Sequence, residues 1–335
     1  MENKNTLYLI KLNGKYGYIN NKGEISIIPS FDYAEQFING LAIVSIDNKY
    51  GYIDITGKVV VKIEYEDIYD FSEGLAAIEV NGKKGYVNEN GDQVINPQFD
   101  EVNGFSEGLA AVKAGYKWGY IDKEGSLIIE PQFLDAFSFN EGLAVVQLGG
   151  KLGYINKMGE IVIEPKYDYA FGFSEGLAAV QEKNNYGYID KSGKMVISDK
   201  YSIANDFIEE RAVVEFKDKY GFIDKNGDMV ITAKYDWADD FSDGLAAVAI
   251  GEKYGFIDKE GNEVIPVKFD NVDTVSEELI SVEEQGKWGY IDKSCNFIIA
   301  PSFTEASSFN DGIAKVEVDN RIRYINKKGE YVWKP

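Results

Sequence analysis

The sequence has no histidine, one cysteine and three arginines among its 335 residues. Without histidine the chain lacks the commonest general base, Ser-His and Cys-His arrangements, and imidazole metal ligands. The lone Cys295 excludes an internal disulfide and a thiolate metal site. Carboxylate pairs could still serve a glycosidase, but catalysis needs a unique constellation of side chains, whereas the acids here recur at equivalent positions. We therefore predict no enzyme activity, no catalytic residue, no metal site and no cofactor.

Long hydrophobic runs are also missing. The apolar run at residues 7–10 is too short for a signal peptide, and nothing approaches a membrane span, so we expect a cytoplasmic protein. The net charge is −21, from 56 acidic and 35 basic residues. Phosphate groups attract basic stripes, so we expect neither nucleic acid nor an anionic membrane as a partner. The acidic surplus serves solubility, and it alternatively suits a basic protein partner.

What the sequence does contain is a period of 34 residues that runs from end to end without insertion or deletion. The glycine of a Lys-aromatic-Gly-aromatic-Ile-Asx motif follows this step at Gly17, Gly51, Gly85, Gly119, Gly153, Gly187, Gly221, Gly255 and Gly289, and Arg323 takes the tenth position. Such a period indicates a solenoid, a propeller or another array. We predict a polar lead-in at residues 1–6 and a single array at 7–335, with units 7–40, 41–74, 75–108, 109–142, 143–176, 177–210, 211–244, 245–278, 279–312 and a partial 313–335.

Each unit has three short strand-like runs. In the unit 109–142 these runs are 109–113, 118–121 and 127–129, rich in β-branched or aromatic residues and bounded by turn residues. Between the second and third runs, Asn or Asp is followed three residues later by Gly, which is typical of a type I turn with a G1 bulge. Cys295 replaces this Gly, so we expect backbone strain there or a turn shifted to Asn296. We interpret this thiol as drift from glycine, since no electropositive niche activates it.

Two aromatic residues follow the third run in most units. The first stands at Phe31, Tyr65, Phe99, Phe133, Tyr167, Tyr201, Tyr235, Phe269 and Phe303. The second stands six residues later, at Phe37, Phe71, Phe105, Phe139, Phe173, Phe207, Phe241 and Phe309, with Val275 in the eighth unit. We expect these side chains to hold an irregular crossover onto the strands. Each unit is thus predicted to be a three-stranded antiparallel meander with a crossover.

The motifs resemble those of the bacterial WG-repeat family, whose unit reads Lys-Trp-Gly-Tyr-Ile-Asp. Residues 117–122 and 287–292 match it directly, and the resemblance covers 7–335. The units that contain Glu210-Arg211 and Glu278-Leu279 depart most, because these pairs replace Gly-Leu. The resemblance implies repeated β-structure and transfers no activity and no catalytic residue.

Two features remain as candidate binding sites, and the ligand-binding residues stay unknown. The Asx turns offer one oxygen ligand each, and four of the ten are Asn, so turn chemistry explains them better than calcium does. An aromatic row could stack sugars or form the core between repeats, and we favour the core because large aromatics dominate packing. This row is Tyr16, Tyr50, Trp118, Tyr186, Tyr220, Tyr254 and Trp288.

The repeat count decides the predicted architecture. Propeller blades usually have four strands and number four to eight, whereas this chain shows three strands in each of ten units and no spare strand to close a ring. We therefore predict an all-β, open superhelical solenoid, with a closed β-propeller-like ring as the alternative. The predicted function is a non-enzymatic scaffold that binds another protein through an extended acidic surface. The alternative is a glycan-binding module that uses exposed aromatic rows.

Overall fold

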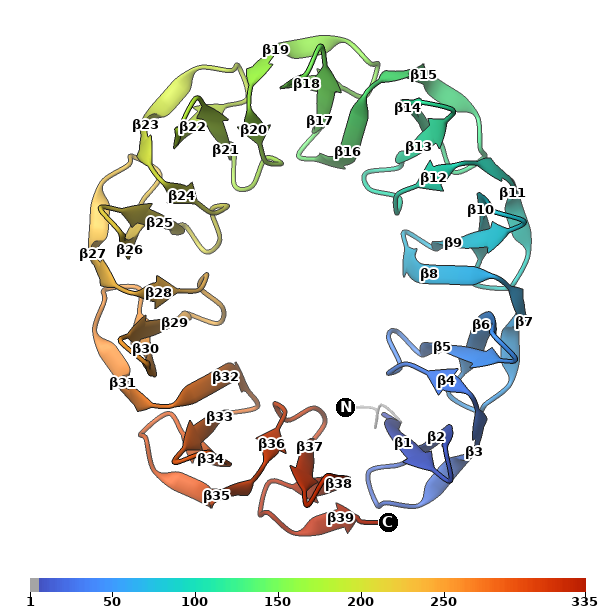
Figure 1. The fold of residues 1–335 in the computed structure, drawn as a ribbon, viewed down its shortest axis with the longest axis vertical. Helices are drawn as coiled ribbons and strands as arrows, with labels where there is room; N and C mark the ends of the chain where they lie inside the picture. The colour runs from blue at the N-terminus through green and yellow to red at the C-terminus, as the bar shows by residue number, and fades with distance from the viewer. Residues whose placement is uncertain (1–5) are drawn as a thin grey trace. The chain divides into compact units, whose positions relative to one another are not determined.

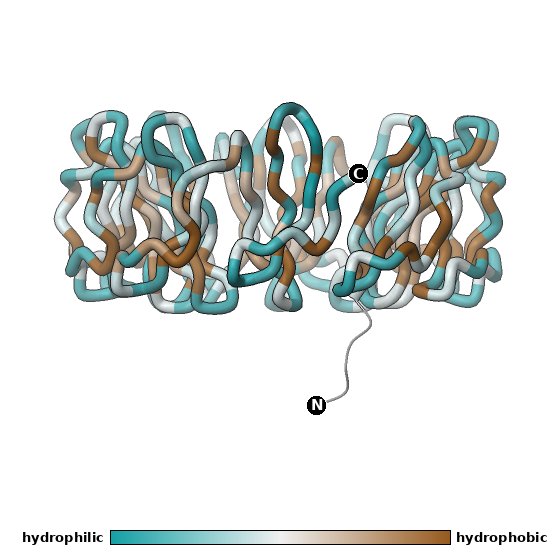
Figure 2. Tube along the Cα trace, turned by 90° about the horizontal axis from the view of Figure 1, so that it is seen from below, coloured by the Kyte–Doolittle hydropathy of each residue, from teal (hydrophilic) through white to brown (hydrophobic). Residues whose placement is uncertain are grey.

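The computed structural model describes residues 6–335, and the secondary structure of these residues consists of strands, β1 to β39 (Figure 1). The lead-in predicted for residues 1–6 lies outside the described residues except for Thr6. Hydrophobic residues follow the strands and hydrophilic residues gather at the turns (Figure 2). Within 6–335 there is no helix long and apolar enough to cross a membrane.

The strands form ten antiparallel sheets in chain order. The first sheet holds β1 (Tyr8–Leu12), β2 (Lys15–Ile19) and β3 (Ile25–Phe31). Nine four-stranded sheets follow: β4 (Tyr33–Ala34), β5 (Leu41–Ile46), β6 (Lys49–Asp54) and β7 (Val59–Tyr65); β8 (Asp67–Ser72), β9 (Leu75–Val80), β10 (Lys83–Asn88) and β11 (Gln93–Phe99); β12 (Glu101–Val102), β13 (Ala110–Ala114), β14 (Lys117–Ile121) and β15 (Leu127–Phe133); β16 (Asp135–Asn140), β17 (Leu143–Leu148), β18 (Lys151–Asn156) and β19 (Ile161–Tyr167); β20 (Tyr169–Ala170), β21 (Leu177–Glu182), β22 (Asn185–Asp190) and β23 (Met195–Tyr201); β24 (Ile203–Ala204), β25 (Ala212–Phe216), β26 (Lys219–Ile223) and β27 (Met229–Tyr235); β28 (Trp237–Ala238), β29 (Leu245–Ile250), β30 (Lys253–Asp258) and β31 (Glu263–Phe269); β32 (Asn271–Ser276), β33 (Leu279–Glu284), β34 (Lys287–Asp292) and β35 (Phe297–Phe303); β36 (Glu305–Ala306), β37 (Ile313–Val318), β38 (Arg321–Asn326) and β39 (Tyr331–Trp333).

The predicted three-stranded meander is wrong, because the expected crossover contains a fourth strand. In the sheet β4–β7, Tyr33 pairs with Ser45 and Ala34 pairs with Val44, so β4 is the edge strand beside β5. Strand β8 pairs with β9 in the same way, with a register shift between Ile68 and Phe71. A two-residue or bulged edge strand leaves no alternating pattern in the sequence, since backbone hydrogen bonds alone define it.

The Asx-Gly turns form as predicted. At the turn between β6 and β7, the Asp54 carboxylate accepts the N–H groups of Thr56 and Lys58, and Gly57 is left-handed with φ 83°. The turn between β34 and β35 has the same hydrogen bonds, and Cys295 itself adopts φ 63°. Cys295 therefore adopts the left-handed conformation that the turn requires, and the turn has not shifted to Asn296; the strain stays a prediction.

The core lies between the faces of consecutive sheets. Phe139 of β16 packs on Tyr120 of β14, with ring centroids 5.0 Å apart, and Ala111, Ile129 and Val146 surround them. All five side chains are buried. At this junction each sheet thus buries its apolar face against its neighbour in the chain, as a repeat array requires.

The chain divides into two compact units, one of described residues 13–17 and 29–200, the other of 6–12, 18–28 and 201–335. Within the second unit, the first sheet packs on the last one. The rings of Tyr8 and Tyr324 lie 5.6 Å apart, and the Tyr324 hydroxyl donates to the Leu9 carbonyl at 2.5 Å. Ile10 and Ile313 are buried in the same cluster.

The open solenoid predicted from the sequence is therefore wrong. No spare strand is needed to close the array, because β1 and β2 contact β37 and β38 through the same kind of face that joins the other sheets. The closed, propeller-like alternative fits this packing. Propeller blades of four strands also match the sheets observed.

Candidate binding pocket between the sheets β4–β7 and β8–β11

The lysine of the repeated motif has a structural role. Lys83 at the start of β10 lies 2.5 Å from the Asp100 carboxylate, which also accepts the Gly115 N–H at 2.7 Å. These two contacts hold the pKa of Asp100 below its usual value. Lys151 and Asp168 repeat the arrangement at 2.5 Å. The motif lysine therefore holds the aspartate at the end of its own sheet, and this aspartate accepts a hydrogen bond from the hairpin of the next sheet.

The glycine and the second aromatic of the motif are also structural. A Cβ on Gly85 would lie 2.3 Å from the Ile95 carbonyl oxygen, so only glycine permits the close approach of β11. The buried Tyr86 hydroxyl donates to the Asn103 carbonyl at 2.7 Å, and the Tyr86 ring packs on Phe105. Burial raises the pKa of Tyr86.

The aromatic row singled out in the sequence is covered to different degrees. Trp118 is buried in a core cluster, as predicted, whereas Tyr16, Tyr186 and Tyr254 are only half-buried. The sequence analysis missed a second group of aromatic side chains, which are about half exposed and lie on the edge strands or, for Phe171, directly after one. This group comprises Tyr33, Tyr69, Phe137, Tyr169, Phe171 and Trp237.

A Glu–Lys clamp joins consecutive sheets at several junctions. The Glu107 carboxylate accepts the Gly142 N–H at 3.0 Å and lies 3.0 Å from the Lys157 ammonium, which also donates to the Glu107 carbonyl at 2.9 Å. Burial alone would raise the pKa of Glu107, but Lys157 and Gly142 outweigh it and lower the pKa. In each clamp the lysine lies 50 residues after the glutamate, as for Glu73 and Lys123.

The junction between the sheets β4–β7 and β8–β11 has neither partner of the clamp. Asn39 takes the position of the glutamate and Glu89 takes the position of the lysine, 50 residues later. A cavity of about 420 Å³ opens at this junction, between the sheets β4–β7 and β8–β11. Both sheets belong to the same compact unit. The missing clamp therefore coincides with a pocket.

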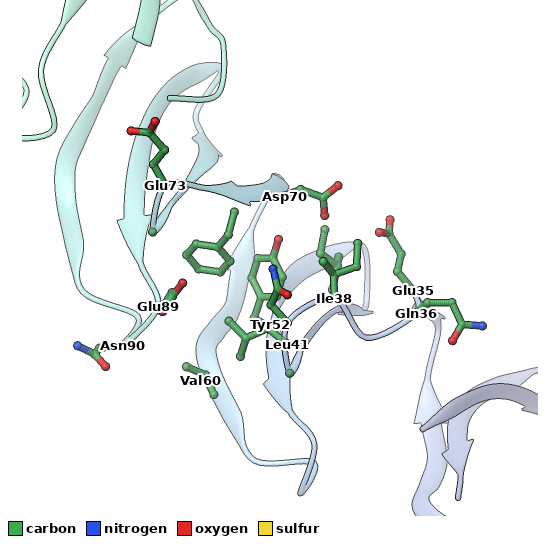
Figure 3. A pocket seen from close by; sticks show the side chains of 15 residues that line it. Glu35, Gln36, Ile38, Leu41, Tyr52, Val60, Asp70, Glu73, Glu89 and Asn90 are labelled. Carbon is green, nitrogen blue, oxygen red and sulfur yellow. The ribbon is translucent and has the colours of Figure 1, made fainter. Parts of the chain in front are cut away.

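The pocket combines an apolar wall with an acidic rim. Figure 3 shows Tyr52 at its centre, with the carboxylates of Glu35, Asp70, Glu73 and Glu89 around it. No lysine or arginine is among the described residues that line it. Burial, followed by the charges of Asp70 and Glu35, raises the pKa of Tyr52, whose hydroxyl donates to a backbone carbonyl at 2.8 Å. The site is therefore suited to a cation with an apolar stem.

A smaller hollow of about 140 Å³ lies between the sheets β28–β31 and β32–β35. Two departures from the repeat meet there, because Val275 stands where eight other units have Phe and Phe256 stands where most have Tyr. Asp240 lines this hollow, and burial raises its pKa. Burial and the charge of Asp240 also raise the pKa of nearby Asp206. The shortened side chain of Val275 accounts for the space.

The predicted absence of metal ligands remains a prediction. Over residues 6–335, no three Asp, Glu, Cys or His side chains are arranged to hold a metal ion. Cys295 is half-buried against the core cluster that contains Ile265 and Phe256. It is not among the residues that line the 420 Å³ pocket.

Antiparallel sheets of this kind, repeated ten times along the described residues, define a tandem-repeat β-propeller scaffold. The family model described as "WG containing repeat" matches nine successive segments, at residues 16–50, 50–83, 85–118, 118–151, 153–186, 186–220, 220–254, 254–288 and 288–321. The chain belongs to this family, and the resemblance found in its motifs is confirmed.

Comparison with solved structures finds similar chains at low sequence identity. One is titled the crystal structure of the eukaryotic initiation factor, with a TM-score of 0.58, 12% identity, and 87% of this chain and 94% of that chain covered. Dihydro-heme d1 dehydrogenase NirN in complex with DHE gives a TM-score of 0.43, at 15% identity over 81% of this chain and 74% of that one. Hsv2p of Kluyveromyces lactis gives 0.40, at 11% identity over 73% and 94%. No curated protein matches the sequence.

The first of these similarities supports a ten-bladed β-propeller and overturns the predicted open solenoid. The sequence analysis missed the pocket as well. Its signal was available in the repeat, because Asn39 and Glu89 each break a periodic row.

Proposed function

We propose that this WG-repeat β-propeller is a non-enzymatic scaffold that binds another protein through its acidic surface. The observation that supports this proposal most is the 420 Å³ pocket, which Glu35, Asp70 and Glu89 line together with Glu73, itself paired with Lys123, and which no basic side chain lines. Lysines elsewhere are engaged in internal pairs such as Lys83–Asp100 and Lys157–Glu107. The surplus of acidic groups is thus available to a basic partner. The proposal includes the cytoplasmic setting expected from the sequence, and no role for nucleic acid or an anionic membrane.

The glycan-binding alternative is favoured by a separate observation. Tyr33, Phe137 and Trp237 on edge strands are about half exposed, and Tyr33 meets Tyr16 and Tyr50 edge-on. Exposed rings of this kind can stack on sugar faces. Only some units have an aromatic residue at these positions, which makes a continuous sugar platform a weaker explanation than an acidic protein-binding surface.

Selection from a library of displayed peptides, run beside a glycan array, separates the two proposals. The protein-binding proposal predicts enrichment of lysine- or arginine-rich peptides whose binding weakens steeply between 50 and 300 mM salt, since exposed charges are screened over about 6–14 Å in that range. A glycan hit with no enrichment of basic peptides contradicts it.

A further inference from the structure

We propose that the pocket between β4–β7 and β8–β11 receives a lysine side chain from the partner protein, in place of the lysine that the chain supplies at other junctions. This inference rests on the proposed function and specifies its site. The pocket is the junction at which Asn39 and Glu89 replace the Glu–Lys clamp.

The other junctions show how this fold holds an ammonium group. Lys123 donates to the Glu73 carbonyl at 2.9 Å and lies 3.1 Å from the Glu73 carboxylate. Lys327 makes the same two contacts with Glu277, at 3.2 and 3.0 Å. A backbone carbonyl at the left-handed turn residue and a carboxylate beside it therefore form a repeated ammonium site.

At the pocket the backbone acceptor remains, while the glutamate carboxylate beside it and the lysine ammonium are missing. Asn39 has the same left-handed turn conformation as Glu73 and Glu107, with φ 51°, so its carbonyl stands where theirs accept lysine. Over residues 6–335, the Asn39 and Glu89 side chains make no hydrogen bond and no ion pair. Glu89, at the position of the missing lysine, adds a negative charge rather than cancelling one.

The walls of the pocket suit the stem of a lysine. Leu41, Tyr52 and Phe71 provide apolar surface, while Asp70 and Glu89 carry charge at the rim. Lysine side chains bury their methylene groups along apolar surface and keep the ammonium among polar groups. An ammonium has three rotatable donors, which fit one carbonyl and two carboxylates better than a planar guanidinium does.

Rebuilding the clamp tests the inference. The double variant Asn39→Glu/Glu89→Lys restores the residues found at the other junctions and places an internal ammonium in the pocket. Asn39→Glu adds one negative charge, and Glu89→Lys replaces a negative charge by a positive one. The net charge of the chain therefore changes only from −21 to −20. The matched control, Asn184→Glu/Glu182→Lys, makes the same charge change at two exposed positions of the same compact unit.

The probe is fluorescein-labelled octalysine, titrated by fluorescence anisotropy with wild type and both variants at 150 mM salt. We expect the rebuilt clamp to weaken binding at least about tenfold and the control to stay within about twofold of wild type. The thermal melt of the rebuilt variant should be unchanged or higher, which shows that it folds.

Three results would overturn the inference. These are equal binding by all three proteins, no binding by wild type, and octa-arginine binding more tightly than octalysine with the same sensitivity to the rebuilt clamp. Equal binding leaves the scaffold proposal standing, because the acidic surface then binds elsewhere. Failure of the scaffold proposal would appear separately, as no enrichment of basic peptides in the library selection.

Discussion

The hydroxyl groups of two buried tyrosines should differ sharply in their contribution to stability. The Tyr120 hydroxyl donates to the Phe137 carbonyl at 2.7 Å, and its side chain is fully buried. The Tyr167 hydroxyl is buried without a hydrogen-bond partner among the described residues. The first hydroxyl satisfies a carbonyl of the neighbouring sheet, whereas the second satisfies nothing.

The magnitudes follow from the hydrogen bonds. Tyr120→Phe removes a buried hydrogen bond and leaves a carbonyl unpaired, which should cost about 1–2 kcal/mol. Tyr167→Phe removes only an unsatisfied polar atom, so the free energy of unfolding should be unchanged or rise by up to about 1 kcal/mol. Phe at the position of Tyr167 is also the residue in five other units, Phe31, Phe99, Phe133, Phe269 and Phe303.

Urea unfolding followed by tyrosine and tryptophan fluorescence and by far-ultraviolet circular dichroism measures both variants. A valid comparison needs coincident transitions and equal m-values, since an array of blades need not unfold in one step. Equal destabilisation by the two substitutions would refute the reasoning, because it would mean that the Tyr167 hydroxyl has a partner or that ring packing alone decides the result.

Three further predictions concern departures from the repeat. Val275→Phe should fill part of the 140 Å³ hollow and raise the free energy of unfolding by about 1 kcal/mol, and a lowered urea midpoint would show that the space is not a packing defect. Asp206→Asn should stabilise the protein at pH 7. Burial raises the folded-state pKa of Asp206. The destabilisation by its buried charge is therefore absent below the unfolded-state pKa of about 3.9 and grows as pH rises through the folded-state pKa. The stabilisation by Asp206→Asn should accordingly shrink towards pH 3.5 in paired urea titrations. Cys295→Gly should relieve strain at a left-handed residue and stabilise the chain by about 0.5–1 kcal/mol, reduced by the lost contact of the Cys295 side chain with the core. An unchanged or lower melting temperature would count against a strained turn.

The parts of the fold that the sequence predicted are those encoded by local chemistry. The Asx-Gly turns could be read directly, because a left-handed residue and a side-chain acceptor are needed at fixed positions such as Asp54 and Gly57. The family could be read from the same motifs, and its match over residues 16–321 bears this out.

The parts that failed depend on distant residues. Strand β4 has two residues, so its pairing with β5 has no pattern of its own. The packing of the first sheet on the last depends on Tyr8 and Tyr324, which are far apart in the chain and resemble the aromatic pairs of other junctions, such as Tyr120 and Phe139. The pocket was only partly readable, since Asn39 and Glu89 depart from their rows, but Asn21 and Ile55 also break the lysine row. Only the clamp at other junctions, seen in three dimensions, shows that these two departures meet.

The central claim is that the acidic pocket is where this propeller scaffold receives a basic partner. The most direct test is a titration of deuterated, ¹⁵N-labelled protein with octalysine, followed through backbone amide chemical shifts. We predict that the largest shifts fall on the amides around Asn39, Tyr52, Asp70 and Glu89, and that Asn39→Glu/Glu89→Lys abolishes them. Shifts spread evenly over exposed acidic residues, or centred at another junction, would contradict the account.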